Sequence, residues 1–166
     1  MSLRLILMRH AKSDWDDPTA SDHERVLNAR GRQNASALGV WLAQKGYRPD
    51  LALVSDASRT GETWLRVSQA WAEAPEVRFQ ATFYNAGPDL LLHAIRAATV
   101  PCVLVLAHNP GIGMLAEHLS AKAPTHSRFA DYPTGSTLVL DFDAPSWADI
   151  GKGQLCDFVI PADLPA

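Results

Sequence analysis

The stretch Leu3-Arg4-Leu5-Ile6-Leu7-Met8-Arg9-His10 decides the fold class of this chain. Positions 3–8 are apolar except for Arg4, so the run lacks the polar alternation of a strand with one face in water. A short run of this kind is typical of a central strand in a sheet that is covered on both faces. Arg9 and His10 follow directly, and polar loop residues come after them. The sequence therefore predicts a buried strand whose carboxyl end carries a cation and an imidazole.

Strands and helices alternate outward from this first strand. Apolar residues recur at helical spacing over 28–46, and Gly46 provides a stop signal for that helix. The further elements expected, in chain order, are strand 51–54, helix 58–72, strand 77–79, a helix opening at Pro88-Asp89, strand 103–106, helix 110–120 with Asn109 as its N-cap, and strands 137–142 and 155–160. This order predicts right-handed crossovers and an α/β fold of three α/β/α layers, in which helices flank a mostly parallel sheet.

Length and composition limit the possible classes of protein. The 166 residues fit a single domain, 1–166, and 15 Lys and Arg against 18 Asp and Glu leave a net charge of −3. No bulk attraction to nucleic acid or to an anionic membrane is expected from that charge. The apolar runs are far shorter than a membrane span, and the first residues lack a cleavage site, which favours a cytoplasmic protein. Cys102 and Cys156 lie in strand-like runs without CxxC spacing, which indicates buried free thiols.

Three predicted strands end in residues suited to binding an anion. Arg9 and His10 follow the first strand, Arg59 comes shortly after the second, and His108-Asn109 follows a later one. Ligand sites of open α/β sheets lie at the carboxyl ends of the strands, so these side chains are expected to converge. Guanidinium groups match the geometry of phosphoryl oxygens, and the helix N-terminus beside His108 adds positive potential. His10 is then the candidate nucleophile, because a neutral imidazole can attack phosphorus.

Ordinary structural roles compete with this interpretation. An Arg-His pair after a strand is more often a surface feature than a catalytic one, and 55–58 could serve only to cap the following helix. Glu62 could brace Arg59 or form an exposed pair with it. The remaining histidines have no strand-end placement and are interpreted as ordinary surface or partly buried side chains: His23, His93, His118 and His126. Neither a metal nor another cofactor is expected, because no helix carries histidines four residues apart around an acid and no carboxylates accompany His10.

Three motifs resemble those of the histidine phosphatase superfamily, which includes the phosphoglycerate mutases. Residues 9–11 (Arg-His-Ala) are similar to its Arg-His-Gly motif, 55–63 (Ser-Asp-Ala-Ser-Arg-Thr-Gly-Glu-Thr) to its second arginine motif, and 107–111 (Ala-His-Asn-Pro-Gly) to its second histidine motif. Their order and spacing agree as well, so the resemblance covers essentially the whole chain. Within the superfamily, residues 9–15, 21–22 and 27–31 look most like the small SixA-type phosphohistidine phosphatases.

This resemblance implies a phosphoglycerate mutase-like fold and a two-step mechanism without metal or cofactor. His10 would attack the phosphoryl group to form a phosphohistidine enzyme, which water would then hydrolyse. Arg9, Arg59, His108 and Asn109 would bind the phosphoryl oxygens, and the arginines and His108 would stabilise the transition state by preorganised charge.

The sequence departs from the superfamily pattern in ways that bear on the substrate. Ala11 and Ala107 stand where glycine is usual, and alanine does not readily adopt a positive φ. The stretch 81–88, which corresponds to the segment carrying the leaving-group acid, contains no Asp or Glu, and Asp89 is interpreted as a helix-start residue. An alkoxide leaving group would need that acid, whereas an imidazole with a pKa near ~6.5 leaves readily once its ring is protonated. The segment 72–87 is also too short for the lid of the larger members, which predicts an open site.

These features predict a phosphatase that removes phosphate from phosphohistidine in proteins, such as histidine phosphotransfer domains. Its partner would be a phosphorylated protein or a small phosphorylated substrate. A small-molecule phosphomonoesterase and a non-catalytic phospho-binding module are the alternatives, and a mutase is less favoured because it benefits from an enclosed site. The presence of both His10 and His108 favours an enzyme over a binding module. Trp15 could rim the site, but packing against the domain is its expected role.

Overall fold

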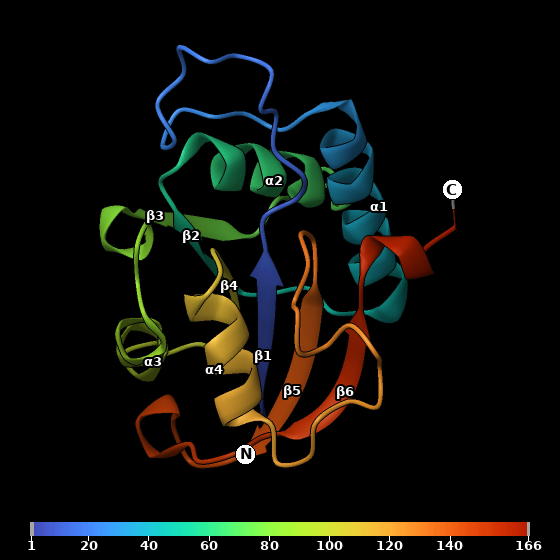
Figure 1. Cartoon of the computed structure of the whole chain (residues 1–166). Helices are drawn as coiled ribbons and strands as arrows, with labels where there is room; N and C mark the ends of the chain where they lie inside the picture. The colour runs from blue at the N-terminus through green and yellow to red at the C-terminus, as the bar shows by residue number, and fades with distance from the viewer. Residues whose placement is uncertain (1, 166) are drawn as a thin grey trace.

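The computed structural model describes residues 2–165, which form a six-stranded sheet with helices on both sides (Figure 1). The strands are β1 (Ser2–Arg9), β2 (Leu51–Ser55), β3 (Glu76–Gln80), β4 (Cys102–Ala107), β5 (Thr137–Asp143) and β6 (Gln154–Val159). The helices are α1 (Ala29–Lys45), α2 (Ser58–Ser68), α3 (Pro88–Arg96) and α4 (Gly111–Leu119), and three short 3₁₀ turns are η1 (Ala81–Phe83), η2 (Trp147–Asp149) and η3 (Pro161–Asp163).

The strand that opens the chain lies inside the sheet, whose order is β3-β2-β4-β1-β5-β6. β1 pairs in parallel with β4, and β2 pairs in parallel with both β4 and β3. β5 is antiparallel to its two neighbours, β1 and β6. The predicted α/β class with a mostly parallel sheet is confirmed, and β5 is the strand that runs against the others.

Helices cover both faces of the sheet, as the apolar first strand predicts. Leu5 and Leu7 of β1 belong to a core cluster that also contains residues of α3 and α4. Ile6 and Met8 belong to a second cluster, which contains residues of α1 and α2. All four β1 side chains are fully buried. The core therefore has one half on each face, and β1 contributes to both.

The end of the helix predicted over 58–72 and the start of the helix predicted over 110–120 differ from the structure. The helix predicted over 58–72 ends at Ser68, where the backbone turns and Ala70 N donates to Val67 O. The helix predicted to begin at Pro110 begins at Gly111, and Pro110 occupies the capping position without a side-chain cap. Both differences are at helix ends, where the local geometry of a turn replaces the helical pattern.

The start of α1 fixes the loop that follows β1. Asn28 caps this helix, since its side chain accepts a hydrogen bond from Gly31 N, and its own N–H donates to Lys12 O. A Cβ at Gly31 would lie 2.1 Å from Lys12 O, so the close approach requires glycine. The chain just after His10 is thus held against the first turn of α1.

Cys102 and Cys156 are free thiols, as predicted, but both are half-buried rather than buried. None of the helices within residues 2–165 is long and apolar enough to cross a membrane.

Candidate active site

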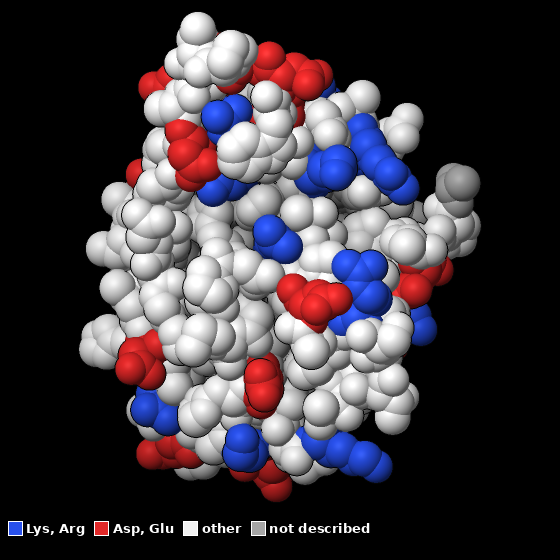
Figure 2. Space-filling view, viewed as in Figure 1, with Lys and Arg blue, Asp and Glu red and all other residues white. Residues whose placement is uncertain are grey.

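The predicted site residues converge at the carboxyl ends of three adjacent strands. His10 follows β1, His108 follows β4, and Arg59 lies in the first turn of α2, just after β2. Because β4 lies between β1 and β2, the three strand ends meet at one edge of the sheet. A backbone bond from His10 N to Ala107 O joins the first two, and the rings of His10 and His108 have centroids 5.2 Å apart. Figure 2 shows basic side chains gathered on this face above the end of β1.

His10 is buried and its ring orientation is fixed. Its side chain is only 6% exposed, and its Nδ1 lies 2.7 Å from Ala11 O. A carbonyl oxygen can only accept, so Nδ1 carries the hydrogen and Nε2 carries the free electron pair. Burial lowers the pKa of His10 to about 3, so the ring is neutral at pH 7. This is the protonation state that a nucleophilic imidazole requires.

His108 has one anchored and one unpartnered ring nitrogen. Its Nε2 lies 2.8 Å from Ser55 Oγ, while its Nδ1 is buried and makes no hydrogen bond to any described residue. Burial, followed by the charge of Arg59, lowers the pKa of His108 to about 4. Ser55 therefore holds His108, so the alternative that 55–58 serves only to cap α2 does not hold, and Ala57 at the capping position has no side-chain cap.

The two guanidinium groups lie close to each other in a poorly hydrated place. Arg9 donates from Nη1 to Tyr132 O at 3.2 Å, and its Nε is buried without a partner in the described part of the chain. Burial and the nearby charge of Arg59 lower the pKa of Arg9. Arg59 donates from Nη1 to Asp22 O at 2.7 Å and from Nη2 to Asp22 Oδ2 at 3.2 Å. An anion between the two cations would relieve their repulsion and supply acceptors for unpartnered nitrogens.

Asn109 is engaged by the protein itself. Its amide donates to Asp131 O at 3.2 Å and to Tyr132 O at 3.0 Å, and its Oδ1 accepts from Gly113 N at 3.2 Å. The prediction that Asn109 is the N-cap of α4 is wrong by one residue, because Pro110 occupies that position, yet the Asn109 side chain still binds a first-turn N–H of the helix. It also holds the same Tyr132 carbonyl that Arg9 binds, and its predicted contact with phosphate stays a prediction.

Backbone geometry at the second histidine motif is regular. Ala107 continues β4, and Tyr132 is the one non-glycine residue among 2–165 with a positive φ, at 45°. The alanine that replaces the usual glycine therefore requires no left-handed conformation.

Two residues that the sequence interpretation missed brace Arg59 and His108. Asp22 accepts hydrogen bonds from Arg59 and from the hydroxyl of Tyr84. The Tyr84 ring lies edge-on to His108, with centroids 5.6 Å apart, and its centroid is 5.8 Å from the Arg59 guanidinium. Asp22 lies in the long loop after β1, and Tyr84 lies just after η1. Both residues follow strands of the sheet, but each lies further from its strand end than the residues that the sequence pattern singles out.

His23 is partly exposed, in agreement with its interpretation as a surface or partly buried side chain, and it has defined partners. Its Nε2 lies 2.9 Å from Asp56 Oδ1, and its ring is edge-on to Tyr84 with centroids 4.9 Å apart. Neither role expected for Glu62 holds, because this carboxylate binds Arg32 and Leu27 N.

Trp15 does not pack into the domain. Its side chain is 68% exposed, and the guanidinium of Arg25 lies 4.1 Å from the centre of its ring. The expectation that it packs against the domain is therefore wrong. In the described part of the chain, no three His, Cys, Asp or Glu side chains are grouped as metal ligands.

Comparisons with known proteins connect this geometry to one family. The family model of the histidine phosphatase superfamily, branch 1, matches residues 5–82. The crystal structure of a candidate phosphohistidine phosphatase, SixA, from Agrobacterium tumefaciens has a TM-score of 0.84 and 30% identity, and the match covers 96% of this chain and 98% of that one. A candidate phosphohistidine phosphatase SixA from Nakamurella multipartitia has a TM-score of 0.83 and 26% identity, with 97% of each chain covered.

Sequence relatives extend the same match over most of the chain. An uncharacterized protein of Mycobacterium tuberculosis is 32% identical over 163 residues, which cover 93% of this chain and 99% of that protein. An uncharacterized chloroplastic protein of Arabidopsis thaliana is 35% identical over 132 residues, or 72% of this chain. The match spans only 60% of the length of that plant protein.

Proposed function

Because this chain belongs to the histidine phosphatase superfamily and is of the SixA type, we propose that it is a single-domain phosphohistidine phosphatase acting on proteins. The observation that carries the proposal is the state of His10. It is a buried, neutral imidazole whose Nδ1–H is held by Ala11 O, beside two arginines. Its Nε2 keeps a free electron pair close to a place that favours an anion.

The proposed reaction has two displacements at phosphorus. In the first, His10 Nε2 attacks the phosphoryl group, the bond to the substrate breaks, and the enzyme holds phosphohistidine. In the second, water attacks the same phosphorus, which releases phosphate and returns His10 to its neutral state. The leaving group takes up a proton in the first step, and the attacking water loses one in the second. Besides substrate and water, both steps use only side chains of this protein, and neither requires a metal or another cofactor.

Arg9, Arg59 and His108 are the proposed partners of the phosphoryl oxygens. Supporting this, Arg9 Nε and His108 Nδ1 are buried without partners, and a buried donor or acceptor left unpaired costs roughly 1–3 kcal/mol. Oxygens of a bound phosphoryl group would complete both. Asn109 is proposed to position Arg9 rather than to contact the phosphoryl group, since its amide binds the Tyr132 carbonyl that also accepts from Arg9.

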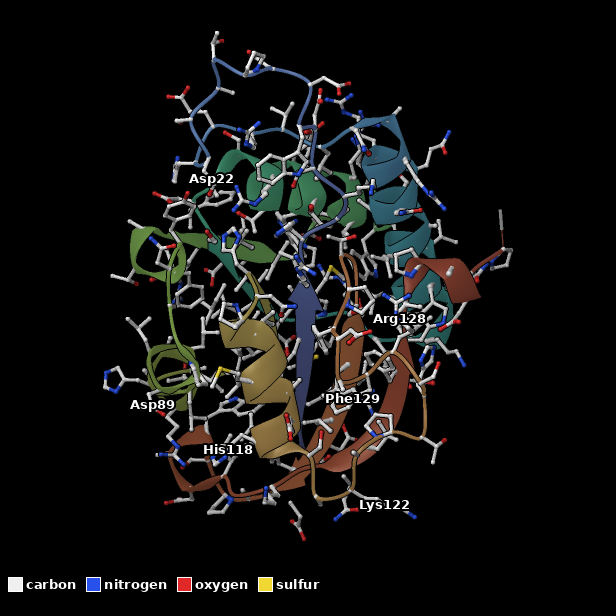
Figure 3. The ribbon with its side chains drawn as sticks, in the orientation of Figure 1. Asp22, Asp89, His118, Lys122, Arg128 and Phe129 are labelled. Carbon is white, nitrogen blue, oxygen red and sulfur yellow. The ribbon has the colours of Figure 1, made fainter. Side chains whose placement is uncertain are left out.

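Two features favour an imidazole as leaving group. The stretch 81–88 carries no carboxylate, and Asp89 lies in the first turn of α3 (Figure 3), apart from Asp22. The segment between α2 and α3 forms only β3, η1 and short turns, so it builds little cover over the site. An open site suits a phosphorylated side chain presented by another protein, such as a histidine phosphotransfer domain.

A substrate comparison tests this proposal. Wild-type protein is incubated with a phosphohistidine-bearing phosphotransfer domain, with phosphoramidate, and with a panel of phosphomonoesters that includes sugar phosphates. We expect the highest kcat/KM on the phosphohistidine protein and no turnover by His10→Ala. Faster hydrolysis of a sugar phosphate would instead establish a small-molecule phosphomonoesterase. Binding of the phosphoprotein without turnover of any substrate would establish a phospho-binding module.

A further inference from the structure

A histidine-carboxylate pair lies beside the site and has no role in the mechanism above. His23 Nε2 lies 2.9 Å from Asp56 Oδ1, and the side chains are 42% and 37% exposed. Because the carboxylate accepts, Nε2 carries a hydrogen and Nδ1 is the nitrogen that can gain or lose a second proton. Ser58 N donates to His23 O at 3.0 Å, which ties this part of the loop to the start of α2. In the described part of the chain, His23 Nδ1 makes no hydrogen bond.

A row of aromatic rings connects this pair with the buried nucleophile. The centroid distances are 5.2 Å from His10 to His108, 5.6 Å from His108 to Tyr84 and 4.9 Å from Tyr84 to His23. Exposure increases along the row, because His10 and His108 are buried and His23 is half open to solvent. Figure 3 labels Asp22, the residue before His23, in the loop above the carboxyl ends of the strands. His23 is therefore the solvent-exposed end of this row of rings, which we call the mouth of the site.

The geometry of phosphoryl transfer places the leaving group at that mouth. The attacking and leaving atoms lie roughly in line on opposite sides of phosphorus. His10 attacks from the buried end of the row of rings. The leaving atom therefore lies on the opposite side of phosphorus, toward the solvent-exposed end where Tyr84 and His23 lie. The side chains at this exposed end are therefore the candidates for a proton donor to the leaving group.

The other polar side chains near this mouth are poorly suited to donate a proton. The hydrogen bond from Tyr84 and the charge of Arg59 lower the pKa of Asp22, so this carboxyl is ionised near neutral pH. The same bond to Asp22 raises the pKa of Tyr84, so its hydroxyl keeps its proton. Asp56 accepts from His23. An imidazole, by contrast, exchanges a proton readily near neutral pH.

We propose that His23 is the proton donor to the leaving group, oriented by Asp56, an assignment that rests on the proposed function. In the first step, His10 Nε2 bonds to phosphorus, the bond to the leaving atom breaks, and that atom takes the proton of His23 Nδ1. In the second step, water bonds to phosphorus, the bond to His10 breaks, and neutral His23 takes the proton that water loses. The donor is thereby restored, and the net change is hydrolysis of the substrate.

A leaving-group comparison distinguishes a proton donor from a residue that only pins the loop. Phenyl phosphate needs protonation of its leaving oxygen, whereas 4-nitrophenyl phosphate releases a stable anion. We expect His23→Gln to lose about 10²-fold or more in kcat/KM on phenyl phosphate and on the phosphohistidine protein, but less than about 3-fold on 4-nitrophenyl phosphate. Asp56→Asn should also lose more activity on phenyl phosphate and on the phosphohistidine protein than on 4-nitrophenyl phosphate, but each loss should be smaller than in His23→Gln. His93 is an exposed histidine of α3, and the control His93→Gln should leave the rates on all three substrates unchanged.

Two outcomes would overturn the assignment while the proposed function stands. One is an equal loss on all three substrates in His23→Gln, which would mean that the pair only holds the loop. The other concerns His23→Ala with the phosphohistidine protein: added imidazole should restore turnover by supplying the missing proton, and no restoration would contradict the donor role. If wild type releases phosphate from none of the substrates, the proposed function itself fails.

Discussion

His10 and His108 are two imidazoles that the fold removes almost completely from water. Burial lowers the pKa of His10 to about 3 and that of His108 to about 4, and neighbouring cations act in the same direction. The folded protein thus keeps both rings neutral at a pH where an imidazole in an unfolded chain, with a pKa near ~6.5, would be half protonated or more. The property that suits His10 for attack on phosphorus therefore also couples folding to pH.

The pH dependence of stability follows from these two pKa values. Between about pH 6.5 and pH 4, the unfolded chain binds protons that the folded protein excludes, so the free energy of unfolding should fall as pH falls. At pH 5 the expected loss is about 2 kcal/mol per buried histidine. Urea unfolding at pH 7 and pH 5 measures this loss. We expect His10→Asn to reduce the loss relative to wild type and the control His93→Asn to leave it unchanged, and an unaltered loss in His10→Asn would contradict the assigned burial.

Arg59 tests the importance of a forked donor at the site. Its two terminal nitrogens bind two oxygens of Asp22, which fixes the plane of the guanidinium. Lysine keeps the charge but cannot make both bonds and face a phosphoryl group as well. We expect Arg59→Lys to lower kcat/KM by about 10²-fold, a loss comparable to removal of one oxyanion donor. Arg66→Lys on the same helix is the matched control, and equal activity of the two variants would argue against the role of Arg59.

Among the elements, α1 and α2 pack so closely that their spacing depends on one position. A Cβ at Gly39 of α1 would lie 2.4 Å from Val67 O of α2. These helices also hold the two loops that approach the site, because the start of α1 binds the chain after His10 and α2 carries Arg59 in its first turn. The spacing of the helix pair thus bears on the position of the phosphate-binding side chains.

Alanine scanning of helical glycines makes this dependence measurable. Gly39→Ala should destabilise the protein by about 1–3 kcal/mol despite the better helix propensity of alanine, because the helices must move apart. Gly61→Ala in α2 is the control, since the nearest atom to its Cβ would be 3.9 Å away, and it should stabilise by up to about 1 kcal/mol. Urea unfolding followed by circular dichroism compares them. A neutral effect of Gly39→Ala would mean that the two helices adjust freely.

At the scale of the whole molecule, the order of the strands determines which site residues can be predicted from the sequence. The apolar run of β1, the alternation of strands and helices, and the polar residues directly after β1, β2 and β4 predict the sheet and the meeting of His10, Arg59 and His108. The contributions of Asp22 and Tyr84 could not be predicted in this way. Each lies several residues beyond a strand, so its place depends on how a long loop folds over the sheet.

The net charge of the molecule does not describe the local charge at the site. A net charge of −3 predicts no strong general attraction to polyanions, but it does not reveal the local concentration of two guanidinium groups and two buried imidazoles. Helix ends are the other features that the sequence leaves open. The end of α2 at Ser68 and the start of α4 at Gly111 depend on turn geometry.

Direct detection of phosphate on His10 tests the account most decisively. Wild-type protein is mixed with a radiolabelled phosphohistidine protein, quenched with alkali within one turnover, and digested for mass spectrometry. We predict an alkali-stable, acid-labile phosphoryl group on the peptide that contains His10. This group should be absent from His10→Ala, and it should persist longer at low temperature, where hydrolysis is slower. Turnover that leaves no phosphoryl group on His10, or that His10→Ala retains at the wild-type rate, would contradict the nucleophilic role of this residue.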